Sequence, residues 1–334
     1  MPLRARAGRK KGRALDIQTG ISIVMNRWLA VKSGELILLV TDEAHTRELE
    51  AFDRWARGQD AVLKAVVLDS VAVQEGTVID EMAALLKSAD VIIGATDSSF
   101  ITARPVADAV ARGARFLSLP LSCADGGSLL ESEFIGMNPA WSRRMALKLM
   151  HPLNRCDTIR VTTPRGTDLT FRKRGRAAGF YCGRAEKRGS VSSASFEAYV
   201  PIEEDQTEGR LVLDGSLGYL GLVREPMEIT FRGGVLHFDG ASPDGRRLSA
   251  YLASFRSENM RRAAEFGIGL NRVSRCRGVS YIEDESAYRT FHIGLGRNLS
   301  MGGRQDADGH FDIVTHRPTI YAGDTLIMRD GEIV

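Results

Sequence analysis

The 334-residue sequence predicts an N-terminal α/β domain with a doubly wound parallel sheet and a C-terminal α+β domain with a largely antiparallel sheet. In the first half, short and continuously apolar segments alternate with segments of helical periodicity. That alternation is typical of parallel strands that helices cover on both faces through right-handed crossovers. After about residue 155, the apolar segments become hairpin-like and turn residues separate them.

The N-terminal elements follow one another as helix and strand. Residues 16–32 have apolar side chains at near-helical spacing, and Ser33-Gly34 ends that segment. We expect strands at 36–40, 62–68, 90–94 and 115–119, and helices at 44–57, 78–87 and 101–112. A helical stretch at about 124–150 connects this half to the next.

The C-terminal half begins with a hairpin, in which 158–163 and 169–172 flank the turn residues 164–168. Further strands are expected at 210–214, 227–231, 234–238, 290–295, 311–314, 318–321 and 324–328. A single helix is expected at about 245–266. The predicted domains are therefore 16–150, an α/β domain, and 151–334, an α+β metal-binding catalytic domain.

The charge of the chain is concentrated at its start. Residues 1–13 carry six basic side chains and no acidic one, and subtracting this +6 from the net charge of +3 leaves −3. We expect residues 1–15 to be a basic, disordered tail, followed by a body that does not bind nucleic acid. No apolar stretch approaches the ~20 residues that span a bilayer, so no membrane partner is expected. Four scattered cysteines without a C-x-x-C pair indicate reduced thiols and a cytoplasmic location.

Two glycine-rich segments, 267–269 and 294–296, are not predicted to bind a nucleotide. Neither completes the pattern G-x-G-x-x-G, and neither opens a helix directly after a strand. We expect close packing of the backbone at these glycines and no dinucleotide cofactor.

His310 and Asp312 give the strongest indication of function. Alternate residues of a strand point to the same side, so this imidazole and this carboxylate would project into one site. Both are good ligands for a divalent transition metal. Other candidates precede them in the same half, at Glu197, Glu265, the acidic run 283–285 and His292. Singly, each has an ordinary explanation, such as a helix-end carboxylate for Glu265, a solvated turn acid for Glu285 or a core histidine for His292. Together they predict a protein that binds metal.

In this order, the same residues resemble the thermophilic metallo-aminopeptidases over roughly residues 20–334. The resemblance is carried by Glu197, 265–271 (EFGIGLN), 283–285 (EDE), 291–296 (FHIGLG), 310–312 (HFD), 89–93, 113–115 and 165–169. It implies two divalent ions (zinc, cobalt or manganese) and a homodimer. The ligands that it implies are Glu197, Glu265, His292, His310 and Asp312.

One residue departs from the pattern of that family. Typical members have a tyrosine seven residues after the strand histidine, where it can steady the transition state, and this chain has Leu299 there.

A second branch of the same fold, 2,5-dihydroxypyridine dioxygenase, opens a ring with one iron(II) held by two histidines and an aspartate. The segments 310–313 and 302–303 are similar to that branch. Glu265 stands where its first iron-binding histidine lies, His292 where it has an aliphatic residue, and Gly294 where it has a substrate-contacting serine. Glu197 has no counterpart there.

The resemblance implies a metallo-aminopeptidase-like hydrolase that cleaves an amide bond of a small amino-acid-like or short-peptide substrate. Two cations ~4 Å apart would polarise the carbonyl oxygen and activate a bridging water. Glu285, with Glu283 in reserve, would accept the proton of that water, and Arg297, Asn298 and Arg304 would bind a substrate carboxylate. Two alternatives stay open: a mononuclear iron(II) ring-cleaving dioxygenase and a non-catalytic small-molecule binder.

Overall fold

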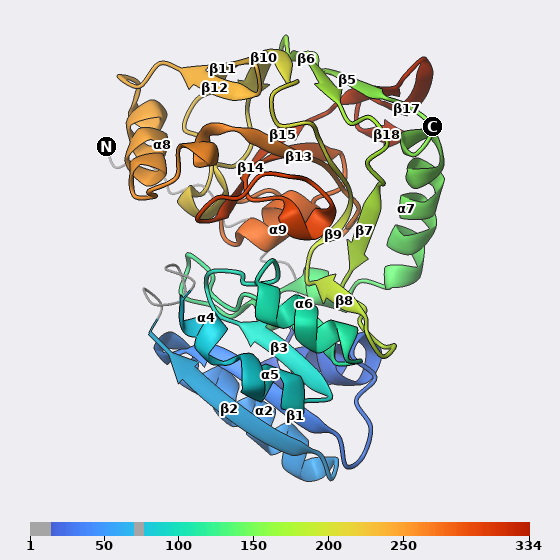
Figure 1. Ribbon diagram of the computed structural model, residues 1–334, viewed down its shortest axis with the longest axis vertical. Helices are drawn as coiled ribbons and strands as arrows, with labels where there is room; N and C mark the ends of the chain where they lie inside the picture. The colour runs from blue at the N-terminus through green and yellow to red at the C-terminus, as the bar shows by residue number, and fades with distance from the viewer. Residues whose placement is uncertain (1–14, 70–76) are drawn as a thin grey trace, which may run out of the picture.

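The computed structural model describes residues 15–69 and 77–334. The predicted tail of residues 1–15 lies outside the described residues except for its last position. The chain forms two halves, which lie one below the other in Figure 1: the N-terminal half (mostly blue to blue-green) below and the C-terminal half (mostly green to red) above. Among the described helices, none has both the length and the apolar character that crossing a bilayer requires.

The N-terminal half contains a five-stranded, fully parallel sheet in the order β2-β1-β3-β4-β8. Four of its strands are the predicted ones: β1 (Leu36–Asp42), β2 (Val62–Leu68), β3 (Val91–Ala95) and β4 (Arg115–Ser118). Their apolar side chains point alternately to the two faces of the sheet, so both faces need a cover of helices.

Helices cover both faces. Ile37 and Leu39 of β1 share a core with α1 and α2, whereas Leu38 and Val40 share a separate core with α4, α5 and α6. These helices are α1 (Ile17–Ile23), α2 (Thr46–Gly58), α4 (Thr77–Glu81), α5 (Ala83–Ser88) and α6 (Arg104–Ala111). The doubly wound arrangement that the sequence predicts is confirmed.

The fifth strand of this sheet comes from the other half. After α7 (Pro139–Leu153), which begins at the N-cap residue Asn138, the chain enters the C-terminal half. It then returns at β8 (Val191–Ser193), which pairs in parallel with β4. The two halves are therefore joined through a shared sheet as well as through α7.

The C-terminal half has two antiparallel sheets (Figure 1). One has eight strands in the order β12 (Val235–Phe238), β11 (Met227–Arg232), β10 (Glu208–Leu213), β6 (Asp168–Arg172), β5 (Thr158–Thr162), β16 (Thr319–Ala322), β17 (Thr325–Arg329) and β18 (Glu332–Ile333). The other has five in the order β15 (His310–His316), β14 (Thr290–Gly296), β13 (Ala263–Gly269), β9 (Phe196–Pro201) and β7 (Gly179–Cys182).

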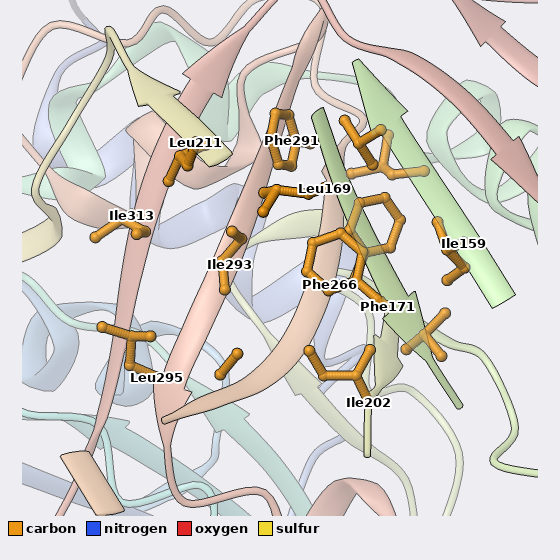
Figure 2. Packing of buried hydrophobic residues seen from close by; sticks show 14 of the residues in the cluster. Ile159, Leu169, Phe171, Ile202, Leu211, Phe266, Phe291, Ile293, Leu295 and Ile313 are labelled. Carbon is orange, nitrogen blue, oxygen red and sulfur yellow. The ribbon is translucent and has the colours of Figure 1, made fainter. Parts of the chain in front are cut away.

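The two sheets enclose a common apolar core, which Figure 2 shows from close by. Phe171 of one sheet and Phe266 of the other have ring centroids 5.3 Å apart, and Phe291 lies 6.1 Å beyond Phe266. All three side chains are fully buried. This core holds the five-stranded sheet in place from one side.

The predicted helix at 245–266 is wrong in its second half. The structure has α8 (Pro243–Ala253), a 3-10 turn at Glu258–Arg261 and then the strand β13. Every residue of β13 is buried, and a continuously buried strand has no periodicity that separates it from a buried helix. The strands β7, β8 and β9 and the helix α9 (Tyr281–Ser286) were also not predicted.

Short helical turns complete the described structure. A π-helical segment at Val24–Trp28 continues α1, and further 3-10 turns lie at Glu43–His45, Leu129–Glu131, Glu133–Gly136, Gly218–Leu220 and Leu299–Met301.

Replacing Phe266 with Ala should lower the free energy of unfolding by about 3–5 kcal/mol, because it leaves a cavity between the two sheets. Urea denaturation measures this change. The matched control is Val62→Ala, at a site that is 51% exposed, where we expect a change below about 0.5 kcal/mol. A loss of less than about 1 kcal/mol for Phe266→Ala would contradict the packing described here.

Candidate metal centre

The five predicted metal ligands lie on one face of the five-stranded sheet. They come from four neighbouring strands: Glu197 from β9, Glu265 from β13, His292 from β14, and His310 and Asp312 from β15. The strand register places Gly294 between Glu265 and Asp312, and Gly267 opposite His292. The ligand positions therefore alternate with glycines across the sheet.

The other face of the same strands is apolar. Phe266, Ile293, Phe311 and Ile313 are fully buried in the core between the sheets. Because side chains of a strand alternate between its faces, the packing on one face fixes the position of the polar side chains on the other.

The ligands form two groups that share Glu265. In the His310 group (Glu265, His310, Asp312), Nε2 of His310 lies 2.9 Å from Oε2 of Glu265 and 3.3 Å from Oδ1 of Asp312. In the His292 group (Glu197, Glu265, His292), Nε2 of His292 lies 2.7 Å from Oε2 of Glu197. Within each group, the potential ligand atoms all lie within 4.8 Å of one another.

Two glycines make room for the imidazole rings. A Cβ atom at Gly267 would lie 1.9 Å from Nε2 of His292, and one at Gly294 would lie 2.5 Å from Nε2 of His310. Gly269 instead approaches backbone, since its Cβ would lie 2.1 Å from the carbonyl oxygen of Ala287. The prediction of close packing at these glycines is confirmed, and at Gly267 and Gly294 the close neighbour is a ligand ring.

Negative charge dominates the site. Four buried carboxyl groups, at Glu197, Glu265, Glu285 and Asp312, surround the two imidazoles. Burial and the nearby Asp312 raise the pKa of Glu285 well above its ordinary value. Burial and the carboxylate of Glu197 also raise the pKa of Glu265, so without a metal protons on some of the carboxyl groups relieve the surplus of negative charge, and a metal cation could take the place of those protons.

The neighbouring carboxylates raise the pKa of both imidazoles. Burial opposes protonation of His292, but the carboxylate of Glu197 outweighs it and raises the pKa of the imidazole to about 9. At His310, burial is likewise outweighed by Asp312 and Glu265, and the pKa lies well above its ordinary value. Without a metal, the protonated imidazoles therefore supply the positive charge that partly balances the carboxylates.

Hydrogen bonds fix the ligands from behind. Nδ1 of His310 donates to the carbonyl oxygen of Arg297 over 2.8 Å, which leaves Nε2 for the site. Ser195 Oγ donates to Oε1 of Glu197 over 2.7 Å. By contrast, Oε2 of Glu197 and Oδ1 of Asp312 face only the imidazoles of the site, 2.7 Å from Nε2 of His292 and 3.3 Å from Nε2 of His310. Carboxylate oxygen and imidazole nitrogen atoms that converge within 4.8 Å of one another fit a divalent metal ion, which would replace the protons between them.

A cavity of about 960 Å³ lies over the His310 group, between the two halves of the chain. The N-terminal half contributes residues 99–104, which follow β3. The C-terminal half contributes the aromatic side chains of Tyr219 and Tyr281, whose ring centroids are 4.2 Å apart, and the apolar side chain of Leu299. A planar, partly apolar molecule fits such a lining.

The two acids predicted to act as proton acceptors lie in different surroundings. Glu285 lines the cavity, and its buried Oε2 has no hydrogen-bond partner. Glu283 accepts from the Arg277 side chain over 2.6 Å and from the Arg275 backbone over 3.2 Å. The geometry favours Glu285 as the group that can exchange a proton with a bound molecule.

The three residues predicted to bind a substrate carboxylate also lie in different surroundings, and only one of them lines the cavity. Arg297 lines the cavity and pairs with Asp306 over 3.1 Å. Asn298 is fully buried, and its amide donates to Glu204 and to the carbonyl oxygen of Ala264. It therefore holds the loop together and has no free group for a substrate. Arg304 is exposed, and its backbone N–H donates to Glu204 over 2.9 Å.

A further group of potential ligands, Asp42, His45 and Asp97, lies at the carboxyl edge of the parallel sheet. Here the polar atoms satisfy one another. His45 Nε2 lies 3.0 Å from Oδ1 of Asp97, and Oδ2 of Asp42 accepts from the backbone N–H of Asp97 over 2.9 Å. This group has no orphaned buried atom that requires an ion.

Tyr219 and Tyr281 were not identified from the sequence. Tyr281 begins the helix α9, and Glu285 lies one turn later on the same side. The pattern Ser280-x-x-Glu283 is typical of a helix start and indicates this helix in retrospect. Tyr219 lies in a 3-10 turn, for which the sequence has no comparable signal.

Comparisons with known proteins place this site in context. The model of the NicX family, described as 2,5-dihydroxypyridine 5,6-dioxygenase, matches residues 29–334. The structure of 2,5-dihydroxypyridine dioxygenase from Pseudomonas putida KT2440 has a TM-score of 0.78 at 18% identity, over 95% of this chain and 96% of that chain. Wild-type AmpT from Thermus thermophilus has a TM-score of 0.63 at 14% identity, over 95% of this chain and 98% of that chain. No curated protein matches the chain.

Both solved structures share the fold of this chain, and the family match lies with the dioxygenase branch. The order that the sequence suggested, with the aminopeptidases first, is therefore reversed. The mixed fold of parallel and antiparallel sheets is confirmed.

Replacing Gly267 with Ala should displace the His292 ring, because the new Cβ would lie 1.9 Å from Nε2. We expect metal affinity to fall roughly 10- to 100-fold, the usual effect of disturbing groups around a metal ligand. Elemental analysis after dialysis against defined free metal measures it. Gly58→Ala is the control, since no atom lies within 4 Å of its new Cβ. Equal metal retention in both variants would show that the His292 ring does not influence the site.

Glu204 links the loop after β14 to the sheet, and its contribution to the stability of the folded protein should depend on pH. Burial alone would raise its pKa, but Arg176, the Arg304 backbone and Asn298 lower it to about 2. A lowered folded-state pKa means that the stabilisation is full above the unfolded value, about 4.5, and is lost as the pH falls toward 2. Urea denaturation should therefore show Glu204→Gln to be less stable than wild type at pH 6, with a smaller difference at pH 3. A difference that grows on acidification would contradict this sign.

Proposed function

The chain belongs to the 2,5-dihydroxypyridine 5,6-dioxygenase family and is a metal-dependent enzyme, and from this premise we propose that it opens a hydroxylated aromatic ring with dioxygen. The observation that carries the proposal is the continuous family match over 29–334, which includes every residue of the His310 group. The aromatic cavity above that group supports a planar substrate.

We propose that Glu265, His310 and Asp312 hold iron(II). One imidazole and two carboxylates differ from the two histidines and one carboxylate that are typical of non-haem iron oxygenases. The atoms are nevertheless donors that iron(II) accepts, and their convergence within 4.8 Å of one another supports an ion there. When bound, iron(II) supplies the redox chemistry by which dioxygen reacts with an aromatic ring.

The protein itself would orient the substrate and move a proton. Tyr219 and Tyr281 would form the wall on which the ring rests. Glu285, whose free carboxyl oxygen faces the same cavity, would accept the proton of a ring hydroxyl group. The cavity between the halves would limit the access of water to the reacting ring.

A second candidate is the amide hydrolase. The observation that favours it is the pair of adjoining ligand groups that share Glu265, an arrangement suited to two metal ions. Leu299 weighs against it, because this exposed apolar side chain lies in the cavity wall at the position of the expected tyrosine. The metal identity and number therefore remain part of the proposal.

The homodimer, the cytoplasmic location, the absence of a nucleic-acid partner and the substrate role of Arg297 stay predictions.

The purified protein, loaded with iron(II) under argon, should consume oxygen and open the ring of 2,5-dihydroxypyridine in equal amounts. An oxygen electrode and the ultraviolet absorption of the ring measure both. His310→Ala should lower the rate by more than roughly 100-fold, since it removes a ligand rather than a neighbour of one. The exposed His237 of β12 provides the matched control, and His237→Ala should keep the wild-type rate.

The same preparation, loaded with cobalt, manganese or zinc, is tested in parallel on aminoacyl amides and dipeptides. Amide cleavage without oxygen consumption on any ring substrate would replace the proposal with the hydrolase. Neither activity, together with tight binding of a ring substrate, would favour the non-catalytic binder.

A further inference from the structure

A second cluster of polar side chains lies outside the metal centre, at the carboxyl edge of the parallel sheet. It joins the ends of three strands, since Asp42 ends β1, Asp97 follows β3 and Ser122 follows β4. His45, in the 3-10 turn after β1, is at its centre: Nε2 lies 3.0 Å from Oδ1 of Asp97 and 3.3 Å from Oδ1 of Asp42. The same nitrogen lies 3.3 Å from Oγ of Ser122. One buried imidazole therefore connects all three strand ends.

This cluster lies at the base of the cavity wall that the N-terminal half provides. Asp97 lies two residues before the start of residues 99–104, which line the cavity over the metal centre. The backbone N–H of Asp97 donates to Oδ2 of Asp42 over 2.9 Å, so both the main chain and the side chain of Asp97 are held. Residues 97–104, which we call the wall segment, are thus fixed to the sheet at their start.

The cluster also lies where a doubly wound sheet usually binds ligands. The strand order β2-β1-β3-β4 reverses between β1 and β3, because the chain places β2 on one side of β1 and then continues at β3 on the other. Loops that leave the carboxyl ends of such a pair diverge and form a crevice for ligands. The contact between His45 and Asp97 crosses this crevice, because His45 follows β1 and Asp97 follows β3. It therefore sets how the wall segment leaves the sheet.

We infer that His45 is a positioning residue, which holds the wall segment in the place where it closes the cavity over the metal centre. The inference rests on the proposed function and adds to it a control of substrate binding by the N-terminal half. A substrate that packs against the wall segment binds more tightly when that segment is already ordered, because ordering it on binding would cost affinity. Removing the imidazole should therefore weaken substrate binding but leave the metal in place.

Charge makes this contact dependent on pH. The charged groups around the imidazole are three carboxyl groups and, behind one of them, a guanidinium: Asp42, Asp97, Glu48 and Arg47. Oε2 of Glu48 lies 3.9 Å from Nδ1 of His45, and Arg47 pairs with Glu48 over 3.5 Å. Burial lowers the pKa of His45, but the hydrogen bond to Asp97 and the charge of Asp42 outweigh it and raise the pKa above its ordinary value of 6.5. The contact is therefore strongest while the imidazole is protonated, and it weakens as the pH rises through the raised pKa.

Hydrogen exchange measures the wall segment directly. In His45→Ala, the amides of residues 97–104 should exchange roughly 10-fold faster than in wild type. This is the lower end of the effect of losing a hydrogen bond to a charged group, because the side chain of Asp97 is partly exposed. Mass spectrometry of peptides from both proteins, exchanged at pH 6, gives the ratio. The readout needs neither metal nor substrate.

Binding of 2,5-dihydroxypyridine to the iron(II)-loaded proteins under argon measures the consequence for the substrate. At pH 6 we expect Kd to be roughly 10-fold higher for His45→Ala than for wild type, at equal metal content. His45→Gln resembles the neutral imidazole, so it should bind less tightly than wild type at pH 6. That difference should shrink as the pH rises to 9, because the wild-type imidazole then loses its proton.

Glu35→Gln is the matched control. Glu35 pairs with the buried Arg115 at the opposite, amino edge of the same sheet, where β1 and β4 begin. Losing this ion pair loosens the same sheet without touching the wall segment. The exchange of residues 97–104 and the Kd should therefore equal those of wild type.

Wild-type exchange of residues 97–104 in His45→Ala would overturn the inference and leave the proposed function intact. So would faster exchange with an unchanged Kd, or equally faster exchange in Glu35→Gln, which would reflect only a general loss of stability. If wild type neither binds nor converts 2,5-dihydroxypyridine, the proposed function fails, and the exchange alone decides whether His45 positions the wall segment. Should His45→Ala not fold, His45→Gln at pH 6 takes its place in both measurements.

Discussion

The surplus of buried carboxylates on one face of the five-stranded sheet is the constraint on which the rest of the structure depends. Burying unpaired charge is costly, and two imidazoles cannot balance the carboxyl groups of Glu197, Glu265, Glu285 and Asp312. A divalent cation can. The glycines opposite the rings, the hydrogen bond behind His310 and the convergence of carboxylate and imidazole atoms are all consistent with a site that is complete only with metal.

The part of the molecule that holds the candidate metal ligands rigid differs from the part that controls access to them. The core between the two antiparallel sheets holds the strands that carry the ligands, with Phe266 and Phe291 packed behind Glu265 and His292. The cavity wall comes partly from the other half, through the loop that follows β3. The carboxyl edge of a parallel sheet is a common place for ligands to bind. Here it forms one side of a site whose metal ligands lie on another sheet.

Most of the fold could be predicted, because strands bounded by turn residues and helices with one apolar face leave clear periodic signals. The strand β13 could not, since its seven residues are all buried and show no alternation. Glu265 therefore looked like a residue at a helix end, although it lies in the centre of the sheet. The return of the chain at β8 could not be predicted either, because three residues are too few for a pattern.

Only those residues of the candidate site that lie on an element with a recognisable sequence pattern could be predicted. His310 and Asp312 alternate on a recognisable strand, whereas Tyr219 and Tyr281 meet only in three dimensions and belong to no motif. Asn298 illustrates the opposite error, because a polar loop residue turned out to be fully buried. The spacing of Gly267 and Gly294 relative to the histidines was a usable signal: small residues opposite large rings indicate a crowded polar face.

The most direct test of this account is anomalous diffraction at the iron absorption edge from crystals grown with iron(II) under argon. We predict a strong peak enclosed by Glu265, His310 and Asp312, at ligand distances of about 2.0–2.3 Å, a range typical of transition metals bound by nitrogen and oxygen. A fully loaded crystal without a peak at these three residues, or with its only peak at Asp42, His45 and Asp97, would contradict the claim that the buried carboxylates exist to hold a metal.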